Sequence, residues 1–185
     1  MKSRNEASLL IRPVVAALAL SGMLCIAQGG RPKLYPSPDK AFVATVRPVS
    51  QGEESVVEVK SAKGQLAWRL DLHSADGEHG EVVVKAAWTP DGRFFVVSTS
   101  HAGGHSPAMH PTRFWDRRQK KAYDLARFGA EVSDAKFYVY APDVLSTEVR
   151  NCKQPDSDVG IALVLNLRDL VDIGKLPASF PCARQ

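Results

Sequence analysis

The chain has 185 residues, enough for one domain with a hydrophobic core, and its 24 basic and 20 acidic side chains give a formal net charge of +4. Three of those basic residues and one acidic residue fall within the first 27 positions, which leaves 21 basic against 19 acidic in the remainder. So small a charge, with no long basic stretch, excludes a nucleic-acid-binding groove.

The first 27 residues have the three parts of a cleavable export signal. Three basic residues precede the apolar run VVAALAL, and SGMLCIA follows it. Cys25 and Ala27 put small residues at both positions that the peptidase reads, so we expect cleavage after Ala27, with Gly29 as the alternative site. The apolar run is shorter than the roughly 20 residues that cross a membrane. An uncleaved anchor and a lipoprotein modified at Cys25 stay open as alternatives. The sequence predicts a periplasmic or secreted protein with no membrane span after cleavage.

Residues 28–185 are expected to form one domain, because short β-rich runs separated by turn residues continue through most of it. The predicted strands are 41–49, 55–61, 65–72, 81–88, 93–100, 112–118, 121–125, 135–141, 144–150 and 160–167. The tail, residues 168–185, starts within a short predicted helix, LRDLVDIGKL. Aromatic residues fall within these strands, and we expect them to pack between sheets, with a ligand-stacking surface as the alternative.

The dipeptide Pro-Asp recurs with a period of 52 residues, at Pro38-Asp39, Pro90-Asp91 and Pro142-Asp143. Proline presets a turn and aspartate hydrogen-bonds to its backbone, so the pair suits a corner between antiparallel strands. Equal spacing with similar surroundings indicates a structural repeat. The expected units are residues 33–75, 80–127 and 131–167.

The segment AWTPDGRFFVVSTS resembles the TolB-type β-propeller repeat, in which an aromatic residue, a Ser/Thr-Pro-Asp-Gly turn and an apolar strand open a four-stranded blade. The residues that match are Trp88, Pro90, Asp91, Gly92 and Arg93, with weaker matches at Pro38, Asp39, Pro142 and Asp143. The resemblance implies an all-β fold, an antiparallel meander of blade-like repeats. Propellers close with four to eight blades, and this chain supplies at most three. We therefore expect an open monomer, with a ring completed by further chains as the alternative.

Two cysteines remain after the signal, Cys152 and Cys182. An even pair in an oxidising compartment predicts a disulfide, which would tie the tail to the body of the domain. Closing a loop of 30 residues is worth about 3–4 kcal/mol in the chain-entropy model. The alternative is two buried free thiols.

All five histidines lie in two predicted loops, the first containing His73 and His79, the second His101, His105 and His110. Neutral imidazoles are good ligands for zinc and copper, but this spacing matches no specific metal motif. The leading interpretation is therefore a glycine-rich hairpin loop without a cofactor. A zinc or copper site is the alternative.

No complete catalytic motif is present, since the serines near the histidines lack the Gly-x-Ser-x-Gly frame. The sequence favours a non-enzymatic exported module that binds a protein partner in the cell envelope. A permanent place in a larger envelope complex is a related hypothesis. The alternative is a metal-binding protein or metal-dependent hydrolase that uses His101, His105 and His110.

Overall fold

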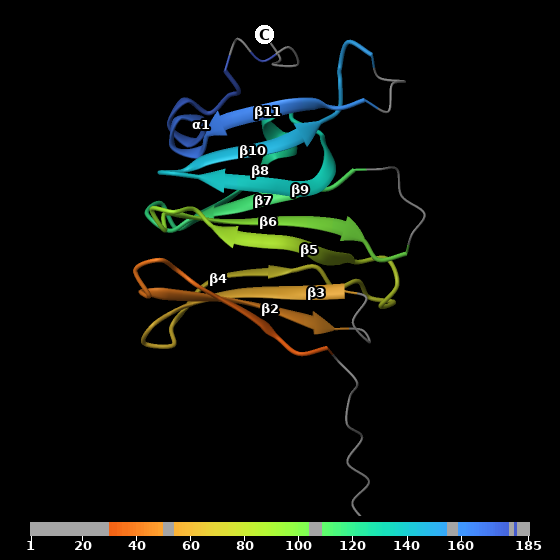
Figure 1. The fold of residues 1–185 in the computed structure, drawn as a ribbon. Helices are drawn as coiled ribbons and strands as arrows, with labels where there is room; N and C mark the ends of the chain where they lie inside the picture. The colour runs from red at the N-terminus through yellow and green to blue at the C-terminus, as the bar shows by residue number, and fades with distance from the viewer. Residues whose placement is uncertain (1–29, 50–53, 104–108, 155–158, 178–179, 181–185) are drawn as a thin grey trace, which may run out of the picture.

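Three antiparallel β-sheets follow one another along the chain and stack in that order (Figure 1). This computed structural model describes residues 30–49, 54–103, 109–154, 159–177 and 180. The predicted signal at residues 1–27, His105 and Cys182 lie outside them. Among the described residues, no helix is long and apolar enough to cross a membrane.

Each sheet is a meander in which neighbouring strands are consecutive in sequence. The first sheet contains β1 (Lys33–Pro36), β2 (Phe42–Val49), β3 (Glu54–Ser61) and β4 (Leu66–Asp71). The second contains β5 (Glu81–Trp88), β6 (Phe94–His101), β7 (Thr112–Asp116) and β8 (Lys121–Asp124). The third contains β9 (Val132–Tyr140), β10 (Val144–Val149) and β11 (Ile161–Asn166). The predicted all-β meander is confirmed.

Two short helices complete the described fold: the 3₁₀ helix η2 (Leu125–Phe128) after β8 and α1 (Leu167–Ile173) after β11. The side chain of Asn166 accepts a hydrogen bond from the amide of Asp169 and so caps α1, which ends at Gly174. The predicted C-terminal helix is therefore present. Strand β1 and helix η2 are absent from the predicted elements.

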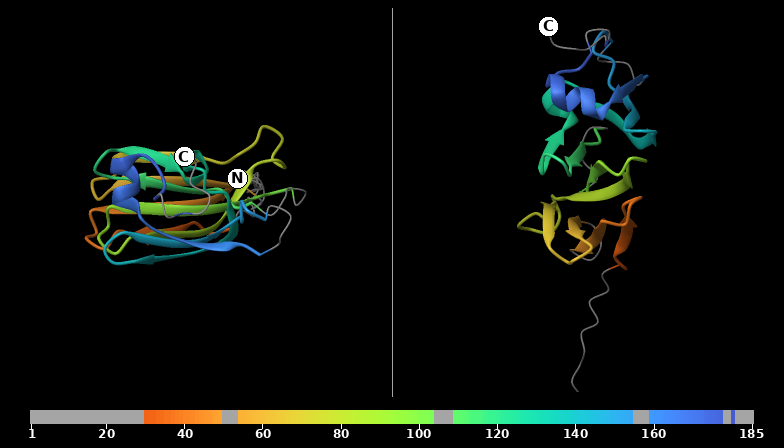
Figure 2. Two further views of the ribbon diagram at one scale, coloured as in Figure 1. Left: turned by 90° about the horizontal axis from the view of Figure 1, so that it is seen from above. Right: turned by 90° about the vertical axis from the view of Figure 1, so that its left-hand side faces the viewer.

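The second sheet is the middle layer of the stack and is buried on both faces (Figure 2). Successive side chains of a strand point to opposite faces, so the apolar run at the start of β6 divides between two cores. Phe94 and Val96 pack toward the third sheet, whereas Phe95 and Val97 pack toward the first. This double burial explains why the run is continuous rather than alternating.

Each Pro-Asp dipeptide lies in the turn between the first and second strands of one sheet. In the first two turns the aspartate accepts a hydrogen bond from a hydroxyl two residues before it: Ser37 Oγ to Asp39 at 2.6 Å, and Thr89 Oγ1 to Asp91 at 2.7 Å. The residue after each aspartate has a positive φ, 58° at Lys40 and 68° at Gly92. The two turns are therefore closely similar in detail.

The three turns are stacked at one end of the sheets. The amide of Asp91 donates to the carbonyl of Pro142 at 3.1 Å, which joins the second turn to the third. A Cβ placed on Gly92 would lie 3.3 Å from Pro38, so the first turn packs closely on the second. The Pro-Asp turns thus help to hold the sheets together.

Arginines bridge the sheets at the same end. Arg117 of the second sheet forms a 2.7 Å ion pair with Asp39 of the first, and its hydrogen bond holds the pKa of Asp39 well below the usual range. Arg168, in α1, lies 3.5 Å from Asp91 and 3.2 Å from Asp143. Asp143 is fully buried, and burial raises its pKa. The first turn is thereby linked to Arg117 of the second sheet, and the second and third turns are both linked to Arg168 of α1.

Candidate functional site

The two histidine-containing loops lie side by side. Residues 72–80 connect β4 to β5, and the second loop begins at the end of β6. The amide of Ala102 donates to the carbonyl of Gly80 at 2.9 Å, and Gly103 lies close to the carbonyl of Glu78. The topology therefore brings the two loops together at the end opposite the Pro-Asp turns.

The first loop is organised by a buried carboxylate, Glu54, at the start of β3. This carboxylate accepts hydrogen bonds from the amide of Gly80 at 2.7 Å and from the amide and hydroxyl of Ser74. Any Cβ at position 80 would collide with Glu54 and with the carbonyl of Leu72, so the loop needs glycine there. Glu54 has a structural role that loop composition does not reveal.

The described histidines have separate partners. His73 Nε2 lies 3.8 Å from Glu54, and His79 Nδ1 lies 2.5 Å from Asp76, which raises the pKa of His79. His110 Nδ1 lies 3.3 Å from the carbonyl of Thr99. His101, at the end of β6, is exposed.

No group of three His, Cys, Asp or Glu side chains within the described ranges is arranged to hold a metal ion. His105 lies outside those ranges, so zinc or copper binding through the second loop stays a prediction. Elemental analysis of the purified protein tests it: a stoichiometric metal that is lost in the His101→Ala/His105→Ala variant would support a site, and unchanged metal content in that variant would contradict it.

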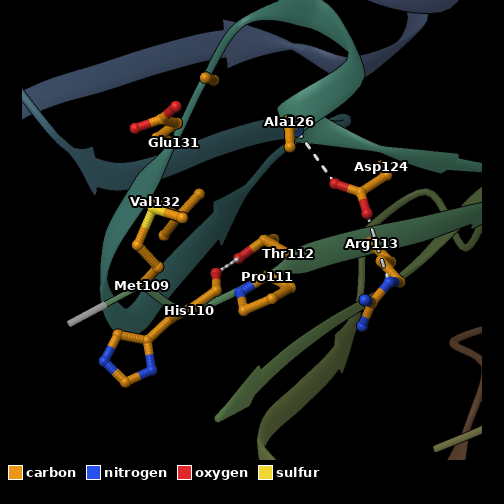
Figure 3. Close-up of a pocket in the computed structure, with 10 residues that line it drawn as sticks. Met109, His110, Pro111, Thr112, Arg113, Asp124, Ala126, Glu131 and Val132 are labelled. Atoms are coloured by element: carbon orange, nitrogen blue, oxygen red, sulfur yellow. Dashed lines mark hydrogen bonds and ion pairs between the residues drawn. The ribbon is translucent and has the colours of Figure 1, made fainter. Parts of the chain in front are cut away.

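A small pocket of about 110 Å³ lies beside the second loop, between the segment leading into β7, helix η2 and the start of β9 (Figure 3). Met109 and His110 stand on one side of it, and Arg113 and Asp124 on the other (Figure 3). The amide of His110 donates to the carbonyl of Val132 at 2.8 Å, which fixes the pocket wall to β9.

Two charged residues that line this pocket, Arg113 and Asp124, belong to one ion-pair network with Glu81. Arg113 holds Glu81 through two hydrogen bonds of 2.6 and 3.0 Å and reaches Asp124 at 3.3 Å. Burial alone would raise the pKa of Glu81, but hydrogen bonds from Arg113 and Thr99 outweigh it and the pKa is lowered. Since the guanidinium is occupied, it is poorly placed to bind an anionic ligand. The pocket is better explained as part of a structural network.

The outer face of the first sheet is covered by ion pairs. Glu58 of β3 pairs with Lys60 at 2.8 Å and with Arg69 of β4 at 3.2 Å, and Arg69 pairs with Asp71 at 2.8 Å. The alternate residues of the same strands, such as Val57 and Val59, are buried against the second sheet. This face therefore consists mainly of ion pairs, with Leu34 of β1 exposed in the row of Glu58.

The outer face of the third sheet is different. Tyr138 and Tyr140 of β9 and Val164 of β11 are 56%, 54% and 61% exposed. Tyr138 and Val164 flank Ser146 in one cross-strand row, and the two tyrosine rings lie 6.5 Å apart at 26°. We call Tyr138, Tyr140, Ser146 and Val164 the tyrosine face.

Core packing is the prediction for the strand aromatics, and for Tyr138 and Tyr140 this prediction is wrong. In the run AKFYVY, Phe137 is buried and Val139 packs against the same core, so the tyrosines between and after them point outward. The alternation of residues along this strand could have predicted that the tyrosines face outward. The ammonium of Lys85, from β5, lies 4.6 Å from the centre of the Tyr138 ring and adds a cation beside the tyrosine face.

No family model and no curated protein matches the chain. Among solved structures, a protein of Clostridium novyi NT named as a conserved lipoprotein is 17% identical, with a TM-score of 0.44 over 75% of this chain and 86% of that one. Two structures of puromycin hydrolase are each 16% identical, with TM-scores of 0.40 and 0.39 over 74% of this chain. This chain spans about a fifth of their length. Similarities this low carry no argument about function.

Proposed function

We propose that this protein is an exported, non-catalytic binding module whose tyrosine face docks on a partner protein of the cell envelope. The signal-like N-terminal sequence supports export. The contrast between the two outer sheet faces carries the binding proposal: one is crossed by ion pairs beside the exposed Leu34, and the other exposes two stacked tyrosines and a valine.

A stack of repeated units needs polar outer faces at both ends to stay separate in water. The ion pairs of the first sheet make its outer face mainly polar, apart from Leu34. Exposed apolar patches with polar rims mark interaction sites, and tyrosine is enriched at the centres of protein interfaces. Lys85 and Lys136 lie on or beside β9 and supply a basic rim. The tyrosine face therefore has the composition of a docking surface.

The polar outward side chains of β10, the central strand of the third sheet, argue against permanent burial of this face under a fourth sheet. The side chains of β2 and β6 that face the next sheet include Ala44, Val46, Phe94 and Val96. The residues of β10 that share the tyrosine face are Val144, Ser146 and Glu148, a more polar set. A surface with exposed aromatic residues around a polar centre suits a partner that binds reversibly.

Site-specific crosslinking tests the proposal. A photoreactive amino acid at position 138 should crosslink to a defined envelope protein in periplasmic extract, whereas the same group at position 69, on the ion-paired face, should not. The double variant Tyr138→Ser/Tyr140→Ser should then bind the purified partner at least tenfold more weakly, because tyrosines central to an interface each contribute about 2 kcal/mol or more.

The matched control is Arg69→Ser, which should leave the dissociation constant unchanged. All these side chains are exposed, so we expect both variants to fold. Thermal unfolding of each variant checks this. Equal crosslinking from positions 138 and 69, or no crosslinking from either, would contradict docking through the tyrosine face.

A further inference from the structure

Exposed basic side chains gather at the end of the stack that carries the Pro-Asp turns. Because each sheet is a meander, alternate turns of a sheet lie at the same end. The turns β1–β2, β3–β4 and β7–β8 therefore share this end, at the left of Figure 1. Each of them contains one or two exposed basic residues. We call these residues the basic end: Lys40, Lys63, Arg118 and Lys120.

Direct contacts join the three turns. The amide of Ala62, in the β3–β4 turn, donates to the carbonyl of Ala41, in the β1–β2 turn, at 2.8 Å. The β7–β8 turn reaches the β1–β2 turn through the 2.7 Å ion pair of Arg117 with Asp39. Each of these four residues is next in sequence to a member of the basic end. The basic residues thus belong to one connected surface of the first two sheets, although they are scattered in the sequence.

The positive charge of this surface is not neutralised within the protein. The acidic side chains in the turns of the first two sheets at this end, Asp39, Asp91 and Asp116, are each occupied by an arginine that is not a member of the basic end. Among the described residues, no member of the basic end forms an ion pair. The exposed acids Asp169 and Asp172 of α1 confine the basic surface to the first and second sheets.

Two of the lysines occupy positions that favour glycine. Lys40 and Lys120 have φ values of 58° and 53°, in the left-handed region that a residue with a Cβ enters only at a cost. Gly92 takes the position of Lys40 in the second Pro-Asp turn, with a φ of 68°. Since neither lysine gains an ion pair among the described residues, this cost points to a use of their charge outside the protein.

We propose that the basic end docks the protein on an anionic lipid surface. Clusters of basic residues are attracted to negatively charged headgroups. Lysine ammonium groups are flexible point charges, and they suit headgroups that move laterally. Leu66, which follows the β3–β4 turn, is 54% exposed, and an apolar side chain beside lysines can enter the headgroup boundary.

Docking through this end leaves the tyrosine face accessible, because that face lies on the flat side of the third sheet and not at the ends of its strands. The inference goes beyond the proposed function and does not depend on it. Loss of lipid binding and loss of the partner protein are therefore separate results.

Vesicle sedimentation of the protein purified from the periplasm tests the proposal. In about 0.1 M salt the protein should bind vesicles of phosphatidylcholine that contain about one-third phosphatidylglycerol, and it should not bind phosphatidylcholine alone. Lys40→Gly/Lys120→Gly should bind about tenfold more weakly or less. Glycine accepts the backbone conformation of both turns, so this variant should melt no lower than the wild type.

The matched control is Lys136→Ser/Lys153→Ser, which removes the same charge from exposed positions outside the basic end and should bind like the wild type. A second variant, Lys63→Ser/Arg118→Ser, leaves both left-handed positions unchanged and should lose about as much binding as the glycine variant. Raising the salt to about 0.5 M should release the wild type, because exposed charges are then screened.

Five outcomes would overturn the proposal. Three concern the vesicles: equal binding to neutral lipid, binding that salt does not weaken, or equal losses in the control and in the two basic-end variants. Release by inorganic phosphate at constant ionic strength would assign these residues to a single phosphate group. Tighter binding to duplex DNA than to anionic vesicles would assign them to a nucleic acid.

Discussion

Replacing Asp116 by alanine should lower the free energy of unfolding by about 3–5 kcal/mol, because it leaves a buried cation without its partner. Arg93 and Asp116 are only 7% and 0% exposed. The guanidinium donates to the carboxylate through Nη2 at 2.8 Å and through Nε at 3.2 Å. This hydrogen bonding raises the pKa of Arg93, so the residue stays charged. Urea unfolding of the variant measures the loss.

Two comparisons isolate the cause. Arg69→Ala removes an exposed ion pair of the first sheet and should change stability little. The double variant Arg93→Met/Asp116→Leu should recover the part of the loss that comes from the unpaired guanidinium. It should not recover the part that comes from the amide of Arg118, which donates to Asp116 at 2.8 Å. If Asp116→Ala were as stable as Arg69→Ala, the buried pair would have no special role in the fold.

Local chemistry accounts for the parts of the fold that sequence analysis predicts. The Pro-Asp turns form because proline and aspartate act on their own backbone, and the hydroxyls of Ser37 and Thr89 complete the first two. The third turn has Ala141 in that place, and no hydrogen bond to the side chain of Asp143 is present in the described residues. Asp143 instead lies near Arg168, a contact that only the folded chain creates.

Elements fixed by distant contacts are harder to predict. Strand β1 has four residues, of which three are exposed, so it carries no alternating pattern. A hydrogen bond from the indole of Trp88 to the carbonyl of Tyr35, at 2.8 Å, fixes it against β5. Since the two residues are 53 positions apart, no window of local sequence contains the signal.

In the candidate sites, too, some features follow from local sequence and others from distant contacts. Sequence spacing identifies the histidine loops, but their partners come from elsewhere: Glu54 reaches Ser74 across 20 positions. The outward direction of Tyr138 and Tyr140 follows from strand alternation. That their face is uncovered follows from the number of sheets, which depends on how the whole chain stacks. The tyrosine face could therefore be recognised only in the folded structure.

Two adjacent residues of β7, Phe114 and Trp115, pack into different cores. Replacing either should lower the free energy of unfolding about as much as Asp116→Ala. Trp115 contacts Phe42, Trp68 and Trp88, with ring centres 5.6, 6.4 and 6.3 Å apart, and so joins the second sheet to the first. Phe114 points to the opposite face and packs in the core shared with the third sheet. Alanine at either position should cost about 3–5 kcal/mol of the free energy of unfolding.

The two variants should differ in which sheet opens, because each terminal sheet packs mainly on the middle one and stacked units unfold by neighbour contacts. Hydrogen exchange in Trp115→Ala should accelerate most in β2 and β3, with the third sheet little affected. In Phe114→Ala it should accelerate most in β9 and β10, with the first sheet little affected. Uniform acceleration in both variants would mean that the three sheets unfold as one cooperative unit, whereas selective acceleration would show that the cores between them are separable.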